Sequence, residues 1–388
     1  MNVINGSYHE GEQYFILDTD QLKIGDIILE HGYAKHSDVI CSQTGSRYSH
    51  AMIYVGGTII EATLDGGVFS RVPNRSAVRD INDFKVLRLK ETADVNMFLH
   101  ITDYARSLLG SKYSVAQALS VKGGRSLQNI YQNSRKQFCS RLVAQSYAKG
   151  GVILVQDVNF CSPADIERSD KLFEVPDAVR LASAYEAQHA LAVSPHSEHA
   201  KNTVKFIDFS LKILKKHGVK SVGTPDGEVL IMTLNDISQA VYENSSNHSL
   251  DEELTQAMHD SGYLDHIDID RKVNSFRYNY DQFKLMLDTT SSQEVMFEVL
   301  SDEFYQVCLG FSARLQSYIN GRENHRKFSL KYTEAELLIA RTMLQCLYDR
   351  IVIIEKCTAN KNFSGFKDIN KACNDMLKLN HSYNLKML

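Results

Sequence analysis

The order of apolar and polar residues divides the chain into a strand-rich part and a helix-rich part. Between residues 21 and 90, short runs of β-branched and apolar residues are separated by Gly, Asn, Asp and Ser, which is typical of strands joined by turns. The predicted strands are 25–30, 49–56, 58–63 and 84–90. Residues 94–109 then predict a helix, because Phe98, Ile101, Ala105 and Leu108 recur at helical spacing, and a second helix is predicted at about 138–149. Strands followed by helices indicate an α+β domain that ends near residue 185.

A different pattern begins after residues 185–202, which we interpret as a junction. Residues 204–218 carry apolar side chains at 3-4 spacing and end at Gly218, as a helix would. Ser249 and Glu252 predict a capping box at the start of another helix. A long apolar seam follows, formed by Leu337, Ala340, Leu344, Leu347, Ile351 and Ile354. We therefore predict a domain at 1–190 and an all-α domain at 191–388, with one interruption at 227–234 that is either a strand or a buried helix start.

The strands at 49–56 and 58–63 predict a β-hairpin whose register can be counted. Gly56 and Gly57 form a two-residue loop of the kind that type I′ or II′ turns prefer. With that loop, Val55 pairs with Thr58, and counting back pairs Met52 with Glu61 and His50 with Thr63. One face of the hairpin is then apolar, and the other places the Glu61 carboxylate diagonally across from the His50 imidazole. A carboxylate bonded to one ring nitrogen fixes the tautomer of a histidine and stabilises its imidazolium.

Cys139 stands at the head of the predicted second helix and is the candidate nucleophile. The positive end of a helix dipole lowers the pKa of a thiol, and a nearby imidazolium lowers it further. The free N–H groups of the first turn, including that of Cys139, could also help to hold an oxyanion. A structural interpretation stays open for each residue: a lone cysteine on an apolar helix is commonly a small core residue, and a strand histidine or glutamate is commonly structural or solvated.

Composition and charge narrow the function classes. The 388 residues carry a net charge of −4 and are 43% hydrophobic, which favours folded domains and argues against nucleic acid as the main partner. The seven cysteines are widely spaced and form no CxxC pair, which argues against a disulfide scaffold and a cysteine-built zinc site. The N-terminus lacks the pattern of a secretory signal, and no run of about 18 apolar residues predicts a membrane span.

Six segments occur in an order that resembles a known family. They are GDIIL at 25–29, RYSHAMIYVGG at 47–57, IIEAT at 59–63, SLLGSKYS at 107–114, FCSRLVAQSYAKGGV at 138–152 and CSPADIERS at 161–169. Together they resemble the circularly permuted papain-like hydrolases of the NlpC superfamily, in the YiiX/YaeF-like branch, over roughly residues 20–175. The resemblance implies an antiparallel sheet or small barrel plus a cysteine helix, with the histidine strand ahead of the cysteine helix.

The resemblance also implies roles for individual residues. The family's nucleophile matches Cys139, its base matches His50 and its third polar residue matches Glu61. Tyr113 is expected to line the site, and Tyr48, Ser49, Tyr113 and Ser140 are the candidates for substrate or oxyanion contacts. Ser111 and Ser114 depart from the family's usual Gly-Lys-Pro-Tyr-Asp-like turn. Cys161 is interpreted as a bystander, and Cys41 is the reserve candidate for a reactive thiol.

The implied activity is cleavage of an amide bond, peptide or isopeptide-like, through a thioester acyl-enzyme. A lipid-directed acyl hydrolase or acyltransferase would use the same residues, and a catalytic-like binding module is a non-enzymatic alternative. We expect no cofactor and no metal, because the spacing of His189, His196 and His199 fits no tight metal site. The expected partners are a peptide-like or acyl-lipid substrate and a protein that binds the helical domain, without nucleic acid or a transmembrane segment. The expected location is the cytoplasm of the producing cell, with delivery as a secreted effector as an alternative.

Overall fold

The structure is a computed structural model in which two compact units are distinguished, Met1–Asn244 and Ser245–Leu388. It describes residues 8–33, 35–63, 66–90, 95–113, 137–192, 195–224, 227–288, 292–359 and 364–382. Each unit is described by itself. The boundary at residues 190/191, which the sequence predicts between the catalytic and the helical domain, stays a prediction.

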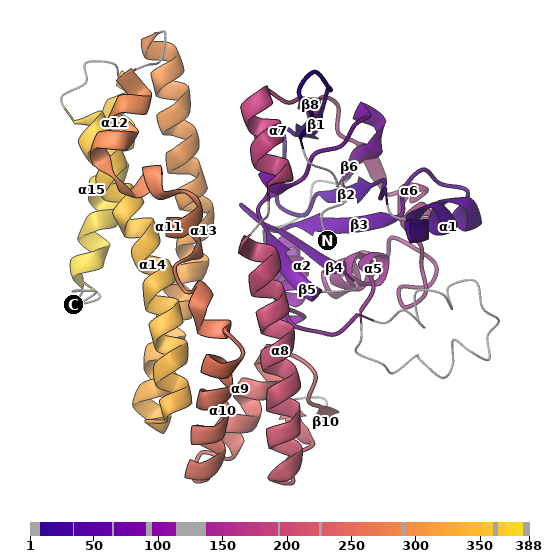
Figure 1. The fold of residues 1–388 in the computed structure, drawn as a ribbon, viewed down its shortest axis with the longest axis vertical. Helices are drawn as coiled ribbons and strands as arrows, with labels where there is room; N and C mark the ends of the chain where they lie inside the picture. Colours follow the sequence, from indigo (N-terminus) through magenta and orange to yellow (C-terminus); the bar gives the residue numbers. More distant parts are fainter. Residues whose placement is uncertain are drawn as a thin grey trace. The chain divides into compact units, whose positions relative to one another are not determined.

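An antiparallel sheet of six strands organises the first unit (Figure 1). Its strands, in the order in which they neighbour one another, are β5 (Gly67–Arg71), β4 (Ile59–Thr63), β3 (His50–Tyr54), β2 (Ile27–Glu30), β6 (Phe84–Leu89) and β7 (Leu172–Glu174). The four predicted strands are confirmed, whereas β5 and β7 were missed. A separate antiparallel pair is formed by β1 (Phe15–Leu17) and β8 (Val179–Leu181).

Two apolar layers cover the sheet because successive strand residues point to opposite faces. On one face, Ile27, Ala51 and Ile53 belong to a core shared with α2 (Val95–Ser107) and α5 (Cys139–Lys149). On the other face, Ile28 and Met52 belong to a core shared with β1 and Val78. The predicted α+β class, with an antiparallel sheet and a cysteine helix, is confirmed.

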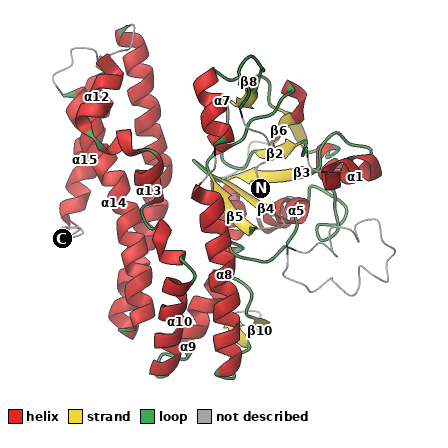
Figure 2. Cartoon of the chain, in the orientation of Figure 1, coloured by secondary structure: helices red, strands yellow, loops and turns green. Residues whose placement is uncertain are grey.

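Further helices of the first unit surround this framework (Figures 1 and 2). They are α1 (Lys35–Thr44), α6 (Pro163–Glu167), α7 (Ala184–Leu191), α8 (Pro195–Lys216) and α9 (Leu234–Glu243). The described residues of the two units also contain four short 3-10 turns. Residues 185–202, interpreted from the sequence as a junction, are mostly helical, because α7 and the start of α8 occupy most of this stretch. A capping box of Ser183 and Glu186, which the sequence reading missed, begins α7.

A small hairpin stands between α8 and α9. It pairs β9 (Ser221–Thr224) with β10 (Gly227–Leu230), so the stretch at 227–234 begins as a strand.

The described part of the second unit is helical, as the sequence predicts for this region. It contains α10 (His248–Asp260), α11 (Ile269–Val273), α12 (Tyr280–Asp288), α13 (Gln293–Phe328), α14 (Lys331–Thr358) and α15 (Ser364–Ser382). The predicted seam lies on α14, where Leu344, Ile351 and Ile354 are buried in the core of this unit. The capping box of Ser249 and Glu252 is wrong, because α10 begins earlier, with Asn247 accepting a hydrogen bond from the Leu250 N–H.

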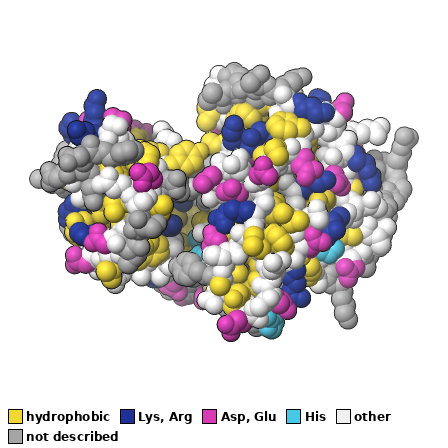
Figure 3. Space-filling model, turned by 90° about the horizontal axis from the view of Figure 1, so that it is seen from above, with side chains coloured by type: hydrophobic (Ala, Val, Ile, Leu, Met, Phe, Trp, Pro, Cys, Tyr) yellow, Lys and Arg dark blue, Asp and Glu magenta, His cyan; other side chains and the backbone are white. Residues whose placement is uncertain are grey.

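The visible surface carries mixed charge. On the face drawn in Figure 3, the described basic and acidic side chains are interspersed. Within the described residues, no helix combines the length and apolar character that crossing a membrane requires.

Candidate active site

The hairpin of β3 and β4 brings His50 and Glu61 together. Gly56 and Gly57 both have positive φ, and the Val55 N–H donates to the Thr58 carbonyl at 2.9 Å, as the predicted turn requires. Ile53 pairs with Ile60 and Tyr54 with Ile59, which is the predicted register. His50 Nε2 lies 2.7 Å from Glu61 Oε2. The diagonal contact expected from the sequence is present, and it leaves the other ring nitrogen, Nδ1, for a different partner.

Arg71, at the end of β5, holds the second oxygen of the Glu61 carboxylate. Its Nε donates to Glu61 Oε1, and both side chains are less than a tenth exposed. Burial by itself would raise the pKa of Glu61, but the Arg71 charge and the His50 contact hold it far below its ordinary value. Glu61 is therefore a carboxylate throughout the neutral range, as an orienting group for a histidine must be.

Cys139 is the first residue of α5. The residue before it, Phe138, is the N-cap and provides no side-chain hydrogen bond to the first turn. The first N–H groups of an α-helix have no intrahelical acceptor, and that of Ser140 interacts with the Cys139 thiol. Cys139 Sγ lies 4.0 Å from the carbonyl oxygen of Ser49, the residue before His50. Residues 90 positions apart in sequence are thus neighbours, and Cys139 is only 6% exposed.

The thiol and the imidazole shift each other's proton affinity. Burial raises the pKa of Cys139, but the hydrogen bond and charge of His50, with the N–H groups of Ala51 and Ser140, lower it below its ordinary value. Burial lowers the pKa of His50, yet its contacts with Cys139 and Glu61 raise it to about 10. Both directions favour a thiolate facing an imidazolium at neutral pH.

Tyr113 also faces the thiol. An isolated bridge joins Tyr113 to Gln137, and the Gln137 N–H donates to the Lys112 carbonyl at 3.0 Å, which ties this segment to the start of α5. Burial and the charge of Cys139 raise the pKa of Tyr113, so its hydroxyl stays protonated. Ser114, which departs from the family's turn, lies outside the described residues.

A known protein family matches the part of the chain that contains this site. Residues 21–197 match the sequence model of a family described as permuted papain-like amidase enzyme, YaeF/YiiX, C92 family. These residues form a permuted papain-like amidase domain. The amidase domain therefore falls in the cysteine peptidase or amidase class, and the expected family is confirmed.

A solved structure and the curated proteins were compared as well. A crystal structure titled as the metalloprotein yiiX from Escherichia coli O157:H7 is 19% identical, covers 40% of this chain and 97% of its own, and has a TM-score of 0.31. A search of curated proteins found no match.

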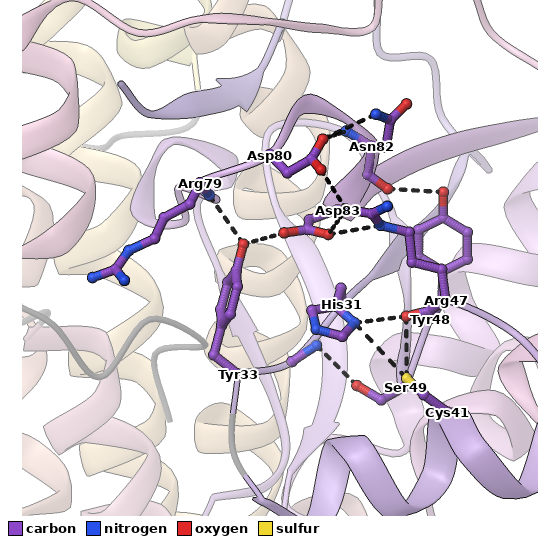
Figure 4. Close-up of polar contacts among 11 residues, drawn as sticks. His31, Tyr33, Cys41, Arg47, Tyr48, Ser49, Arg79, Asp80, Asn82 and Asp83 are labelled. Carbon is purple, nitrogen blue, oxygen red and sulfur yellow. Dashed lines mark hydrogen bonds and ion pairs between the residues drawn. The ribbon is translucent and has the colours of Figure 1, made fainter. Parts of the chain in front are cut away.

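Three of the four hydroxyl candidates, those of Tyr48, Ser49 and Ser140, are hydrogen-bonded within the protein. The Tyr48 hydroxyl donates to the Asn82 carbonyl at 3.1 Å, and Ser49 Oγ accepts from the Gly32 N–H at 2.9 Å (Figure 4). Ser140 Oγ donates to the Cys161 carbonyl at 2.7 Å. These bonds position the backbone on both sides of the thiol. Substrate or oxyanion contacts by the three side chains stay predictions.

Cys41, the reserve thiol, has a histidine neighbour but an unfavourable environment. Its Sγ lies 3.8 Å from His31 Nδ1, and the same nitrogen lies 2.7 Å from the Arg47 carbonyl (Figure 4). A ring nitrogen that donates to a carbonyl carries the proton, so it cannot accept one from a thiol. Burial and the nearby Asp38 raise the pKa of Cys41. These facts favour Cys139 over Cys41.

The remaining thiol and histidine candidates lie elsewhere. Cys161 is buried, and burial raises the pKa of its thiol. His189 is on α7, whereas His196 and His199 are on α8. In the part of the chain that the structure describes, no three His, Cys, Asp or Glu side chains are grouped to hold a metal.

Two charged residues beside the hairpin escaped the sequence analysis. Arg71 lies on β5, which was not predicted, so nothing marked it as a partner of Glu61. Glu30 ends the predicted strand 25–30 and pairs in register with His50. A carboxylate closing an apolar strand was the available signal for Glu30.

Proposed function

We propose that the amidase domain cleaves an amide bond, peptide or isopeptide-like, through a thioester on Cys139, with His50 as acid and base and Glu61 as the orienting group. The observation that carries this proposal is the contact of His50 Nε2 with Glu61. It leaves Nδ1 for Cys139, whose thiol pKa His50 lowers. A Cys-His pair oriented by a third group is the arrangement that nucleophilic catalysis by cysteine needs.

In the acylation step the Cys139 thiolate attacks the carbonyl carbon of the scissile amide. A C–S bond forms, and the carbonyl electron pair moves onto oxygen. The proton already on His50 Nδ1 then passes to the leaving nitrogen, the C–N bond breaks and the amine departs. The products of this step are a thioester and a neutral His50.

In deacylation His50 acts as a base, whereas in acylation it acted as an acid. Water gives a proton to Nδ1 as its oxygen attacks the thioester carbon, and the C–S bond breaks. A carboxylic acid leaves, and the thiolate and imidazolium are restored. Because Glu61 stays ionised in both steps, it stabilises the imidazolium each time that it forms.

Two donors are suited to the oxyanion that forms in both steps. The Cys139 N–H is a free group of the first turn of α5, and the Tyr113 hydroxyl stays protonated beside the thiol. Hydrogen bonds to developing negative charge are the largest single contribution to many acyl-transfer reactions. We therefore assign these two groups to the oxyanion site.

Acyl-enzyme formation tests the proposal directly. The protein is mixed with aminocoumarin amides and p-nitrophenyl esters of the same N-acyl amino acids, and the intact mass is followed. We expect a Cys139-linked acyl adduct with both series, turnover of amides, and neither in Cys139→Ala. The matched control, Cys41→Ser, should behave as wild type.

The outcomes separate the candidate functions. Acylation by esters without any amide turnover would favour the acyl hydrolase or acyltransferase alternative. Absence of a Cys139-dependent adduct even with the activated esters would overturn the hydrolase assignment and leave a binding module.

A further inference from the structure

A buried carboxyl group that the proposed mechanism does not use lies beside the active site. Glu30 is completely buried, and it pairs across the sheet with His50. Neither of its carboxyl oxygens has a hydrogen-bond partner among the described residues. A buried carboxylate without hydrogen bonds is costly, so such a group is expected to have a specific reason to be there.

Arg71 is shared unequally by two carboxyl groups. Its Nε donates to Glu61, whereas its Nη2 lies 3.6 Å from Glu30 Oε2 and 3.0 Å from the Met52 sulfur. One guanidinium in a buried site can neutralise one carboxylate fully. Arg71 lies closer to Glu61 than to Glu30, so its positive charge stabilises ionised Glu30 less than ionised Glu61.

Several elements around Glu30 contribute charged or titratable groups that face it. They are Arg71 on β5, Glu61 on β4, His50 on β3 and Tyr33, which follows β2. On its other side, Glu30 pairs with the apolar Phe84 of β6. Any change in the charge of Glu30 is therefore felt mainly by Arg71, Glu61 and His50.

We propose that Glu30 is a positioning residue of the active site, and that the loss or gain of its proton sets how strongly Glu61 holds the His50 imidazolium. The proposal rests on the function proposed above. When Glu30 ionises, a second negative charge appears near His50. Ionised Glu30 also competes for Arg71 and leaves more of the Glu61 charge to the imidazolium. Both effects act in the same direction and keep His50 protonated to higher pH.

Glu30 gains and loses its proton close to neutral pH. Burial raises its pKa to about 7, against the smaller opposing effects of Arg71 and His50. Glu30 is thus neutral in mildly acidic solution and ionised in alkaline solution, where the imidazolium is lost. Removal of the Glu30 carboxyl group should therefore lower the pH at which the imidazolium is lost (the alkaline limit) and leave the pH at which the thiolate forms (the acid limit) unchanged.

The rate at which iodoacetate alkylates Cys139, followed as a function of pH, measures both the acid and the alkaline limit without a substrate. The rate rises as the thiolate forms and falls as the imidazolium, which attracts the anionic reagent, loses its proton. We expect Glu30→Gln to retain the acid limb and to move the alkaline limb down by about half a pH unit or more. Glu30→Asp, which keeps an ionisable group, should restore part of the shift. Glu174→Gln is the matched control, because Glu174 is an exposed carboxylate of the same sheet paired with Lys85 at 3.5 Å.

A second measurement uses the wild-type protein alone and covers the case in which Glu30 variants fail to fold. The ring resonances of His50, assigned with His50→Gln, should show a step near pH 7 while the ring is still protonated. Absence of this step, or identical alkaline limbs in wild type and a folded Glu30→Gln, overturns the proposal. A wild-type profile without an activated thiol would instead overturn the proposed function, so the two failures are distinguishable.

Discussion

His50 Nε2 lies 2.7 Å from Glu61 Oε2, and the other oxygen of that carboxylate accepts a hydrogen bond from Arg71. The two oxygens of Glu61 therefore have different partners: one orients the imidazole and the other is neutralised by a buried guanidinium. This division lets a carboxylate remain ionised in the interior while its free charge acts on a single histidine.

His50→Ala should remove the activation of Cys139. Without the imidazolium, only the N–H groups of Ala51 and Ser140 oppose the effect of burial, so the pKa of the thiol rises and less thiolate remains at mildly acidic pH. Compared with wild type, we expect labelling of Cys139 by iodoacetamide at pH 6 to slow by roughly two orders of magnitude. The site is identified by peptide mass mapping, and Cys41→Ser serves as the control for labelling elsewhere. Equal rates of Cys139 labelling in wild type and His50→Ala would contradict the activation of Cys139 by His50.

Glu61→Gln should preserve the shape of the site and abolish its electrostatics. The imidazolium loses its nearby carboxylate, and an amide can hold the ring in the wrong tautomer. We expect turnover of a coumarin amide to fall on the order of 10²–10⁴-fold. Circular dichroism and the thermal midpoint establish that the variant is folded. A folded Glu61→Gln protein with wild-type turnover would exclude Glu61 as the orienting group.

Glu30→Gln should change how stability depends on pH. The pKa of Glu30 rises from 4.5 to about 7 in the folded protein, so between these values the native state holds a proton that the unfolded chain has released. This contribution to the stability of the wild type is complete below pH 4.5 and is lost as pH rises through 7. Glutamine cannot ionise, so the stability of Glu30→Gln relative to wild type should increase over this window by a few kcal/mol, at about 1.4 kcal/mol per pH unit.

Urea unfolding of the two proteins at pH 4.5 and pH 8 measures this difference. Glu174→Gln, which alters an exposed carboxylate, should show no comparable change relative to wild type. The same difference between Glu30→Gln and wild type at both pH values would contradict the assignment.

Gly67→Ala should disturb the segment that carries Tyr113. Gly67 has a φ of +60°, and a Cβ there would meet the Ser111 carbonyl oxygen at 2.4 Å. Gly151 also has a positive φ, +84°, but a Cβ there has open space. Gly151→Ala therefore measures backbone strain alone, about 1 kcal/mol, whereas Gly67→Ala adds a clash that we expect to cost about 1–3 kcal/mol more. Denaturant midpoints compare the two, and equal losses would contradict the clash.

The sequence alone determined the features that depend on neighbouring residues. The Gly56-Gly57 loop fixed the register of the hairpin, because a two-residue turn allows only one pairing of its strands, and the contact of His50 with Glu61 follows from that register. The helical stripe of α2 and the seam of α14 were likewise local patterns. The capping box of Ser249 and Glu252 shows the limit of such signals, since Asn247 offered an equivalent acceptor two residues earlier.

Only the tertiary structure decided what surrounds that pair. Arg71 reaches Glu61 because β5 pairs with β4, and Glu30 reaches His50 because β2 pairs with β3. The order of strands in a sheet depends on the burial of whole faces and not on any local pattern. Cys139 was connected to His50 by resemblance to a family, and the fold supplies the physical link: α5 packs on the apolar face of the sheet, which brings its first residue to the start of β3. Long-range packing, which no spacing in the sequence records, thus determines which charges act on the thiol.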